Sequence, residues 1–331
     1  MTKIIVYAVT AEEKPLVEAW ASRHQVDVKL VTEELTVDTV DLAAGFDGVS
    51  TSQVPRIEEP IFSRLHDLGI QQIAQRSAGV DMYDLDQAKE NGIIITNVPT
   101  YSPVSIAEYT LGTIIYLNRR LNNILPRTKA HNFSRSPEVR GRVLKDLTLA
   151  VIGAGHIGQE LARIYSGLGG KVVAYDIAPD PAAEKYLSFV DSVEEAVAQA
   201  DIVSLHMPLT KDNYHMFDAD LLAQCKEGTI LVNNGRGALV DTDALLAAID
   251  SGRIASAALD TYESEGPYVF KDWSDKTIED ERLKTLINHP KILYTPHLAY
   301  YTDDAIKALV DGGLDSALEV IETGDAKNRV N

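Results

Sequence analysis

The chain of 331 residues is poor in cysteine and has no long apolar runs. Its one cysteine, Cys225, cannot form an internal disulfide and has no neighbours at metal-ligand spacing, so we expect a reducing compartment and no bound metal. No apolar stretch approaches the roughly eighteen residues that a membrane span needs. Met1–Lys3 leads straight into apolar residues without the basic region or cleavage site of a secretory signal. These absences predict a cytoplasmic protein.

Positive charge is also scarce. The sequence has 31 lysines and arginines against 49 aspartates and glutamates, and its formal net charge is -18 at pH 7. Such a chain repels nucleic acid and anionic lipid, so neither a nucleic acid nor a membrane is an expected partner. The H-E-x-x-H motif of zinc proteases and the G-x-S-x-G motif of serine hydrolases are both absent. The remaining composition, 45% hydrophobic and 24% charged, is typical of a globular protein long enough for two domains.

A glycine fingerprint in the middle of the chain predicts a dinucleotide site. Residues 151–158 read VIGAGHIG, and the apolar run 147–152 before the glycines is typical of a buried parallel strand, while helical spacing follows them. Gly153 would make the turn, Gly155 would let backbone approach a pyrophosphate, and Gly158 would let the helix pack on its strand.

An acidic residue completes this fingerprint. Asp176 ends the next apolar run, 171–175, about twenty residues past the glycines, where a carboxylate can bind the adenosine ribose hydroxyls. The same carboxylate would repel a 2′-phosphate, so NAD is favoured over NADP. His156 lies inside the turn, where its backbone amide matters more than its ring. The alternative is an ordinary strand-to-helix turn followed by a surface aspartate.

The first hundred residues alternate short apolar runs with amphipathic segments. They predict strands over 4–9, 26–30, 47–50, 72–74 and 93–97, with helices between them, for example over 12–20. This alternation favours a complete parallel α/β domain ahead of the glycine fingerprint.

Turn-forming residues mark the boundary between two α/β units. Pro99, Ser102 and Pro103 interrupt the pattern, and a long apolar helix over 105–120 follows as a connector. A last helical stretch begins near Thr302 and is closed by Val330 and Asn331. Because this stretch lies beyond the final strand of the second unit, 292–294, we expect it to cross back and pack on the first domain. The predicted domains are therefore 1–100 with 300–331, and 101–299.

Three chemically suggestive side chains follow predicted strands of the second unit. Arg236, Glu265 and His297 each come shortly after an apolar run. Because ligands of open parallel sheets bind outside the carboxyl ends of the strands, the three side chains are expected to converge beside the nicotinamide. A cation, a carboxylate and an imidazole are what the reduction of a 2-oxo acid requires.

Each of the three has an expected task. Arg236 can bind a substrate carboxylate and polarise the adjacent carbonyl, and the flanking Gly235 and Gly237 would let a ligand approach closely. His297 is the natural proton donor, and Glu265 would orient its ring and favour the protonated form. The alternative for Arg236 is a surface salt bridge. The histidines interpreted as structural are His24, His66, His131, His206, His215 and His289.

Four further segments carry a family resemblance. They are NVPTYSPVSIAEY at 97–109, NNGRGALVDTDAL at 233–245, LDTYESE at 259–265 and TPHLAYYT at 295–302. Through these the chain resembles the NAD-dependent D-2-hydroxyacid dehydrogenases, and most closely their bacterial D-lactate and D-2-hydroxyisocaproate branch, essentially from end to end. The resemblance implies an α/β protein of two doubly wound parallel-sheet domains, with a Rossmann NAD-binding domain inserted in a flavodoxin-like substrate domain.

The resemblance also implies an activity and a site. The activity is the reversible reduction of a 2-oxo acid to the D-2-hydroxy acid by NADH, in a homodimer with a cleft that closes at hinges near 101–105 and 297–301. The implied catalytic residues are Arg236, Glu265 and His297. The implied cofactor-binding residues are Gly153, Gly155, His156, Ile157, Gly158, Asp176, Pro208, Asn213 and Asp260, the last near the nicotinamide carboxamide. Backbone amides around Ala78 and Gly79 would hold the substrate carboxylate, and Tyr101 would line the pocket.

Departures from the branch bear on substrate choice. Where lactate enzymes commonly read Arg-Asn-Val-Gly, this chain reads Arg-Ser-Ala-Gly over 76–79. Ser52 stands where lactate enzymes tend to carry an aromatic residue, and Tyr300 resembles the tyrosine of relatives that take branched substrates. We therefore expect a pocket that accepts substituents larger than methyl, and expect Ser52, Ala78 and Gly79 to face Arg236 and His297 across the cleft.

Two alternatives share these motifs. Glycerate and phosphoglycerate dehydrogenases are one, but the long segment 266–281 after Glu265 resembles the lactate branch. The other is a co-repressor of the same family that acts as a dinucleotide-sensing interaction module, against which the strong acidity and the compact length argue.

Overall fold

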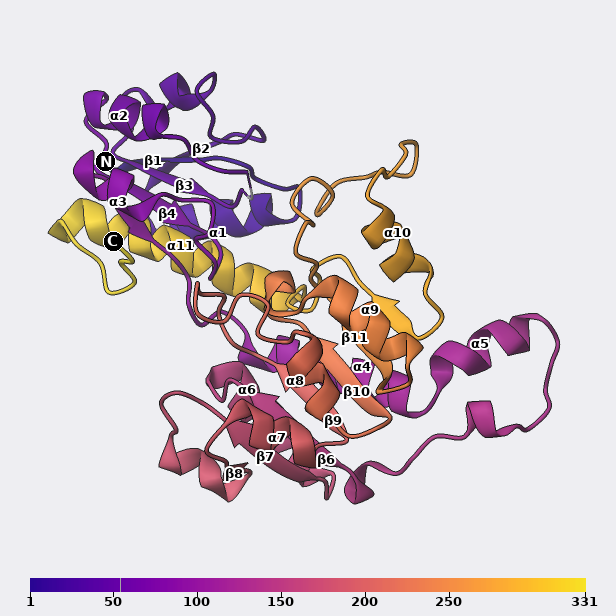
Figure 1. Ribbon diagram of the computed structural model, residues 1–331. Helices are drawn as coiled ribbons and strands as arrows, with labels where there is room; N and C mark the ends of the chain where they lie inside the picture. The colour runs from indigo at the N-terminus through magenta and orange to yellow at the C-terminus, as the bar shows by residue number, and fades with distance from the viewer. Residues whose placement is uncertain (54) are drawn as a thin grey trace. The chain divides into compact units, whose positions relative to one another are not determined.

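A computed structural model describes residues 1–53 and 55–331 (Figure 1). The chain divides into two compact units. Unit 1 consists of Met1–Ser102 and Tyr301–Asn331, and unit 2 is Pro103–Tyr300. No helix of the described residues is both long and apolar enough to cross a membrane.

Unit 1 is built on a five-stranded parallel sheet. Its strands are β1 (Lys3–Val6), β2 (Asp27–Leu30), β3 (Gly48–Thr51), β4 (Gln72–Gln75) and β5 (Ile94–Thr96). They are ordered β2-β1-β3-β4-β5, which is the flavodoxin-like order with its switch point between β1 and β3. The helices are α1 (Glu13–His24), η1 (Val40–Ala43), α2 (Glu59–Asp67), α3 (Leu85–Glu90) and α11 (Asp303–Thr323).

The strands of unit 1 bury side chains on both faces, because consecutive residues point to opposite sides. Ile4 and Val6 pack with Trp20 of α1 and Leu314 of α11, whereas Ile5 joins a second core beneath α2. Helix α11 therefore lies on unit 1, in contact with α1, β3 and β4.

The predicted extent of this last helix was wrong. Helix α11 ends at Thr323, because Gly324 adopts a left-handed conformation with φ +81° and caps it. Beyond it the chain runs along the edge strand β5, where Val330 N donates to Ile95 O at 2.9 Å and Ile95 N donates to Asn331 Oδ1 at 2.9 Å. The final residues thus extend the hydrogen bonding of the sheet rather than the helix.

Unit 2 is built on a seven-stranded parallel sheet. Its strands are β6 (Thr148–Ile152), β7 (Lys171–Tyr175), β8 (Ser188–Phe189), β9 (Ile202–Leu205), β10 (Thr229–Asn233), β11 (Ile254–Leu259) and β12 (Ile292–Tyr294). The order β12-β11-β10-β9-β6-β7-β8 is the Rossmann order with one added strand. The predicted architecture of two doubly wound parallel sheets is confirmed.

Helices cover both faces of this sheet, which is why its strands are almost continuously apolar. The α-helices are α4 (Pro103–Asn118), α5 (Leu121–Lys129), α6 (His156–Gly167), α7 (Val193–Gln199), α8 (Ala219–Gln224), α9 (Thr242–Asp250) and α10 (Glu281–Asn288), and the short 3-10 helices are η2 (Pro137–Val139), η3 (Leu144–Asp146), η4 (Pro181–Lys185) and η5 (Gly237–Leu239). Val151 and Leu161 belong to the core under α4 and α6, and Ile152 and Leu222 to the core on the other face. Cys225 is buried in the latter, and burial raises the pKa of its thiol to about 11, as suits a structural cysteine.

Candidate active site

The glycine fingerprint forms the tight turn that its spacing predicts. Gly153 follows β6 with φ +93°, a conformation that favours glycine. A Cβ at Gly158 would lie 2.2 Å from Gly153 O and 2.8 Å from Val151 Cγ1, so helix α6 packs on β6 only because this residue is glycine. Gly155 is the N-cap of α6, and no atom among the described residues lies within 4 Å of the place a Cβ would take.

The turn leaves the first amides of α6 without a protein cap. Among the described residues no side chain caps this helix, which begins at His156. Uncapped N–H groups and the positive end of a helix dipole bind phosphate groups. An open glycine N-cap before such a helix fits the pyrophosphate of a dinucleotide.

Asp176 connects this turn to the end of β7. Its Oδ2 accepts from Ala154 N at 2.7 Å and its Oδ1 accepts from Ala178 N at 2.8 Å. A carboxylate has about four acceptor positions, so these two bonds leave capacity for the hydroxyl groups of a ribose.

Glu265 and His297 are directly paired at the carboxyl ends of the neighbouring strands β11 and β12. Glu265 Oε1 lies 2.7 Å from His297 Nδ1, and its Oε2 accepts from Tyr262 N at 2.9 Å. Because an ionised carboxylate only accepts, Nδ1 carries the proton in this pair. No described residue bonds Nε2, so this nitrogen is available to a substrate.

Asp260 fixes the turn that presents His297. The Asp260 side chain is buried, accepts from Thr295 Oγ1 at 2.6 Å and Ala299 N at 2.8 Å, and its backbone oxygen accepts from His297 N at 2.7 Å. His297 itself has φ +61°, an unusual conformation for a side-chain-bearing residue. These bonds hold the backbone of His297 in that conformation, and the backbone in turn fixes where the imidazole lies.

Arg236 lies on the turn after β10, the strand next to β11, and is half-buried. A Cβ on the adjacent Gly237 would lie 2.1 Å from Tyr262 C and 2.3 Å from Glu263 N. The turn that carries Arg236 therefore packs directly on the backbone of the turn that carries Glu265. The expectation that Gly237 leaves room for a ligand was wrong, because the chain itself fills that space. At Gly235 the nearest atoms would be 3.4 Å away, an ordinary contact.

The loop after β9 is closed by Asn213. Its Nδ2 donates to Pro208 O at 2.8 Å and its Oδ1 accepts from Thr210 N at 2.7 Å. Two histidines interpreted as structural lie nearby. His206 Nε2 lies 2.9 Å from Ser204 Oγ, and burial lowers the pKa of His206 to about 4, which keeps its ring neutral near pH 7. His215 Nε2 lies 2.8 Å from a Glu263 carboxylate oxygen.

In unit 1 the loop after β4 has its carbonyl groups occupied. Ser77 O accepts from Val98 N at 2.9 Å, Ala78 O from Asn97 Nδ2 at 2.7 Å, and Gly79 O from Ser77 Oγ at 2.7 Å. Within residues 1–53 and 55–331, no group accepts a hydrogen bond from the amides of Ala78 or Gly79. Two adjacent free amides fit an anionic ligand.

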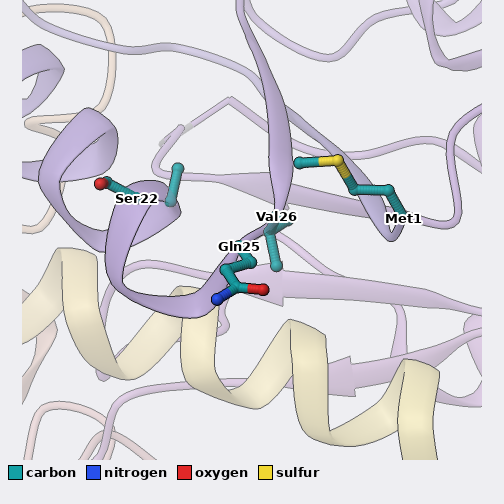
Figure 2. Close-up of a pocket in the computed structure, with 5 residues that line it drawn as sticks. Met1, Ser22, Gln25 and Val26 are labelled. Carbon is teal, nitrogen blue, oxygen red and sulfur yellow. The ribbon is translucent and has the colours of Figure 1, made fainter.

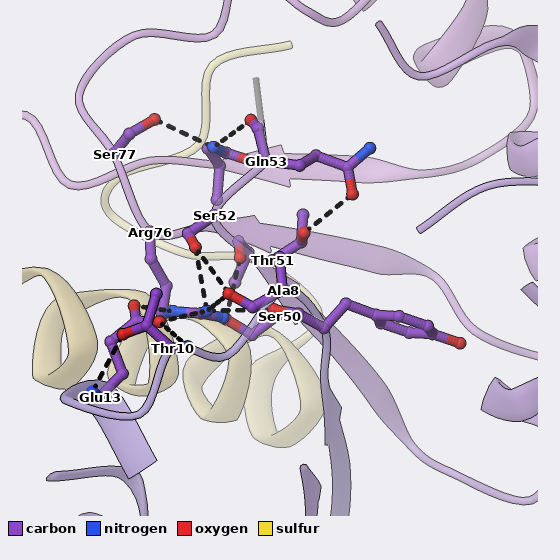
Figure 3. Close-up of polar contacts among 12 residues, drawn as sticks. Ala8, Thr10, Glu13, Ser50, Thr51, Ser52, Gln53, Arg76 and Ser77 are labelled. Atoms are coloured by element: carbon purple, nitrogen blue, oxygen red, sulfur yellow. Dashed lines mark hydrogen bonds and ion pairs between the residues drawn. The ribbon is translucent and has the colours of Figure 1, made fainter. Parts of the chain in front are cut away.

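Ser52 follows β3 and is bound to a cluster that the sequence did not reveal. Ser52 Oγ donates to Ala8 O at 3.3 Å and accepts from Arg76 Nη2 at 3.2 Å, and Arg76 is paired with Glu13 (Figure 3). The only local signal was an arginine placed just after the predicted strand 72–74. Tyr101 and Tyr300, both half-buried, lie next to the two points where the chain passes from one unit to the other.

A surface hollow of unit 1 lies away from these residues. It is lined by Met1, Ala21, Ser22, Gln25 and Val26, at the end of α1 and ahead of β1 (Figure 2). It therefore borders the amino end of β1, whereas ligands of parallel sheets bind at the carboxyl ends. No three His, Cys, Asp or Glu side chains of the described residues are grouped to hold a metal ion.

Residues 111–299 match the sequence profile of the NAD-binding domain of the D-isomer specific 2-hydroxyacid dehydrogenases. A D-lactate dehydrogenase of Streptococcus agalactiae is 49% identical over 329 residues, covering 99% of this chain and 100% of the relative. The chain belongs to the D-isomer specific 2-hydroxyacid dehydrogenase family. It is therefore an NAD-dependent oxidoreductase.

Solved structures of the family share the whole fold. A D-lactate dehydrogenase from Treponema pallidum superposes with a TM-score of 0.92 at 37% identity, with 100% of both chains covered. A D-2-hydroxyisocaproate dehydrogenase also gives a TM-score of 0.92, at 31% identity, with 99% of both chains covered. The chain is thus similar in structure to enzymes named for a small and for a branched substrate.

Proposed function

We propose that the chain reversibly reduces a 2-oxo acid to the D-2-hydroxy acid with NADH, using Arg236, Glu265 and His297. The pairing of Glu265 Oε1 with His297 Nδ1 at 2.7 Å, with Nε2 left to the substrate, is the observation that carries this proposal. Two adjacent strand ends supply the pair, and the turn of Arg236 packs on the same backbone.

The residues divide the chemistry in a defined way. The hydride comes from the nicotinamide when NADH is bound, and the protein supplies orientation and charge. Arg236 holds the substrate carboxylate and polarises the oxo group, whose oxygen gains negative charge during reduction. His297 donates its Nε2 proton to that oxygen, and the Glu265 carboxylate stabilises the imidazolium before the transfer. In the oxidative direction Nε2 accepts the proton.

The cofactor-binding residues of this proposal lie along the carboxyl edge of the sheet of unit 2. The amides of His156 and Ile157 at the start of α6 hold the pyrophosphate beside Gly153, Gly155 and Gly158. Asp176 binds the adenosine ribose. The loop from Pro208 to Asn213 contacts the dinucleotide, and Asp260 lies near the carboxamide.

Cofactor choice tests the Asp176 assignment. Asp176→Asn removes the charge that repels a 2′-phosphate but keeps an oxygen that accepts from Ala154 N. We expect the preference of kcat/KM for NADH over NADPH to fall by about tenfold or more. Asp180→Asn is a matched control, since Asp180 also accepts from a backbone amide nearby, and it should keep the wild-type preference. An unchanged preference in Asp176→Asn would contradict the ribose contact.

In this proposal the free amides of Ala78 and Gly79 hold the substrate carboxylate together with Arg236. The substrate side chain is assigned to Ser52, Tyr101 and Tyr300. A serine at position 52 occupies less volume than an aromatic residue, so isobutyl or benzyl substituents are accepted. Pyruvate is the competing substrate, because the Streptococcus agalactiae relative is named for D-lactate.

A panel of 2-oxo acids with NADH separates these substrates. We expect 2-oxoisocaproate and phenylpyruvate to give a higher kcat/KM than pyruvate, by about tenfold for the added methylene groups. An equal or higher kcat/KM for pyruvate would overturn the larger pocket and leave a D-lactate dehydrogenase. Preference for hydroxypyruvate would instead favour a glycerate dehydrogenase.

We also propose a homodimer in the cytoplasm. Helix α5 buries none of its residues, and Leu125, Phe133 and Val143 in and after it are 47%, 77% and 60% exposed. Exposed apolar side chains gathered in one segment are typical of an interaction surface. Light scattering of the purified protein would give about twice the 36.2 kDa of one chain, whereas the mass of a single chain would overturn the dimer.

A further inference from the structure

We propose that Arg76 is a positioning residue for substrate selection, acting through Ser52 and through the start of the 77–79 loop. The inference rests on the proposed function, because it assumes that these two segments of unit 1 bind a 2-oxo acid.

The Arg76 side chain is fully buried, and every branch of its guanidinium is bonded. Nε and Nη2 donate to the two carboxylate oxygens of Glu13 at 3.0 and 3.3 Å, and the Glu13 side chain is 10% exposed. Nη1 donates to Ser50 Oγ at 3.2 Å, and Nη2 also donates to Tyr7 O at 3.1 Å. A buried guanidinium is tolerated only with such complete pairing, and a planar fork with two bonds to one carboxylate has a fixed orientation.

These bonds join the carboxyl ends of three neighbouring strands. Tyr7 follows β1. Ser50 and Ser52 lie at the end of β3, and Arg76 itself follows β4 (Figure 3). The carboxyl edge between β1 and β3 is the switch point where sheets of this order bind ligands. Here Arg76 and Glu13 occupy that position with protein groups.

The cluster also holds a strained backbone. Ala8 has φ +51°, which is rare for a residue with a Cβ, and its carbonyl accepts from Ser52 Oγ at 3.3 Å. Strained residues persist where the surroundings determine them fully, and they concentrate at functional sites.

Gln75, the last residue of β4, and Arg76, which follows it, bind the segment after β3 from opposite faces of the sheet. Arg76 binds Ser52 on one face, and on the other Gln75 Nε2 donates to Gln53 O at 3.3 Å and to Ser77 Oγ at 3.1 Å. Ser52 and the amides of Ala78 and Gly79 thus belong to one fixed frame. A change at Arg76 is transmitted to both ends of the bound 2-oxo acid.

The test compares four variants of the full-length enzyme. Arg76→Lys keeps the charge but cannot bind both Glu13 oxygens and the two serines. The double variant Arg76→Met with Glu13→Gln removes both charges, so neither is left buried without its partner. It keeps the inference testable if Arg76→Lys does not fold. Ser52→Ala removes only the hydroxyl that Arg76 holds. Arg64→Lys is the matched control, because Arg64 is paired with Asp41 in the same unit but is exposed.

The measured quantities are KM and kcat for pyruvate and 2-oxoisocaproate, the Kd of NADH, and the Kd of oxamate with NADH present. We expect the Arg76 variants to raise KM and the oxamate Kd by about tenfold, below the roughly hundredfold that a 1 Å misplacement can cost. The ratio of kcat/KM for the two substrates should change by about fivefold, in Ser52→Ala as well. The NADH Kd, and all constants of Arg64→Lys, should stay within about twofold, which is about 0.4 kcal/mol.

Two results would overturn this inference and leave the proposed function standing. One is an active wild-type enzyme whose substrate ratio and oxamate Kd are the same in the folded Arg76 variants. The other is a parallel loss of kcat, substrate affinity and NADH affinity, which indicates a general structural role. A wild-type enzyme that binds NADH but reduces no 2-oxo acid would overturn the proposed function and the inference with it.

Discussion

Replacement of His297 by Gln is expected to lower kcat by about 10²- to 10⁴-fold and to leave the Kd of NADH within about twofold of wild type. Gln cannot carry the transferable proton, whereas the Asp260 bonds to the surrounding turn involve Thr295, Leu298 and Ala299 and survive the change. Stopped-flow turnover with a 2-oxo acid and fluorescence titration with NADH measure the two quantities separately.

The chain offers a closely matched control for this experiment. His215 also lies against a carboxylate, with Nε2 2.8 Å from Glu263, in the same unit and with a similarly unusual φ of +51°. His215→Gln removes a histidine–glutamate pair of the same kind but no proposed proton donor, so kcat should fall less than about tenfold. Equal losses in the two variants, or near-normal turnover in His297→Gln, would show that the proton comes from another group.

Strands β6 and β7 of unit 2 could be predicted almost to the residue, because their residues are mostly buried on both faces. The apolar run 171–175 coincides with β7, and the run 147–152 matches β6 to within one residue. Parallel order then places the carboxyl ends of β11 and β12 together, so the turns that carry Glu265 and His297 were expected to be neighbours. In this part of the chain the buried apolar runs locate the strands, and the strands locate the polar residues that follow their carboxyl ends.

Long-range polar partners could not be predicted in the same way. Arg76 and Glu13 are 63 residues apart in the sequence. Neither spacing nor hydropathy indicates that an arginine at the end of a buried strand binds a carboxylate at the start of a helix. The same limit applies at the carboxyl end of the chain. There Gly324 ends α11, and the residues beyond it form hydrogen bonds with β5. Periodicity reports which face of an element is buried, but the partner depends on the assembled sheet.

Gly237 belongs to a correctly identified motif, but the reason expected for it, room for a ligand, was wrong. Its replacement by alanine is expected to lower both stability and turnover. The backbone of Gly237 is not in the left-handed region, so alanine meets no conformational penalty there. The penalty is steric, because the new Cβ would lie 2.1 Å from Tyr262 C and 2.3 Å from Glu263 N, both backbone atoms. The Glu265 turn must therefore move away from the Arg236 turn.

Gly237→Ala is expected to lower the free energy of unfolding by about 1–3 kcal/mol and kcat by about 10- to 100-fold, since displaced turns misplace both Arg236 and the Glu265–His297 pair. Gly235→Ala is the control for stability, because its Cβ would meet its nearest neighbours at 3.4 Å and its unfolding free energy should match wild type. Denaturant unfolding and steady-state kinetics measure both. If Gly237→Ala were as stable and as active as wild type, the two turns would be free to separate, and direct packing could not be what aligns the arginine with the paired imidazole.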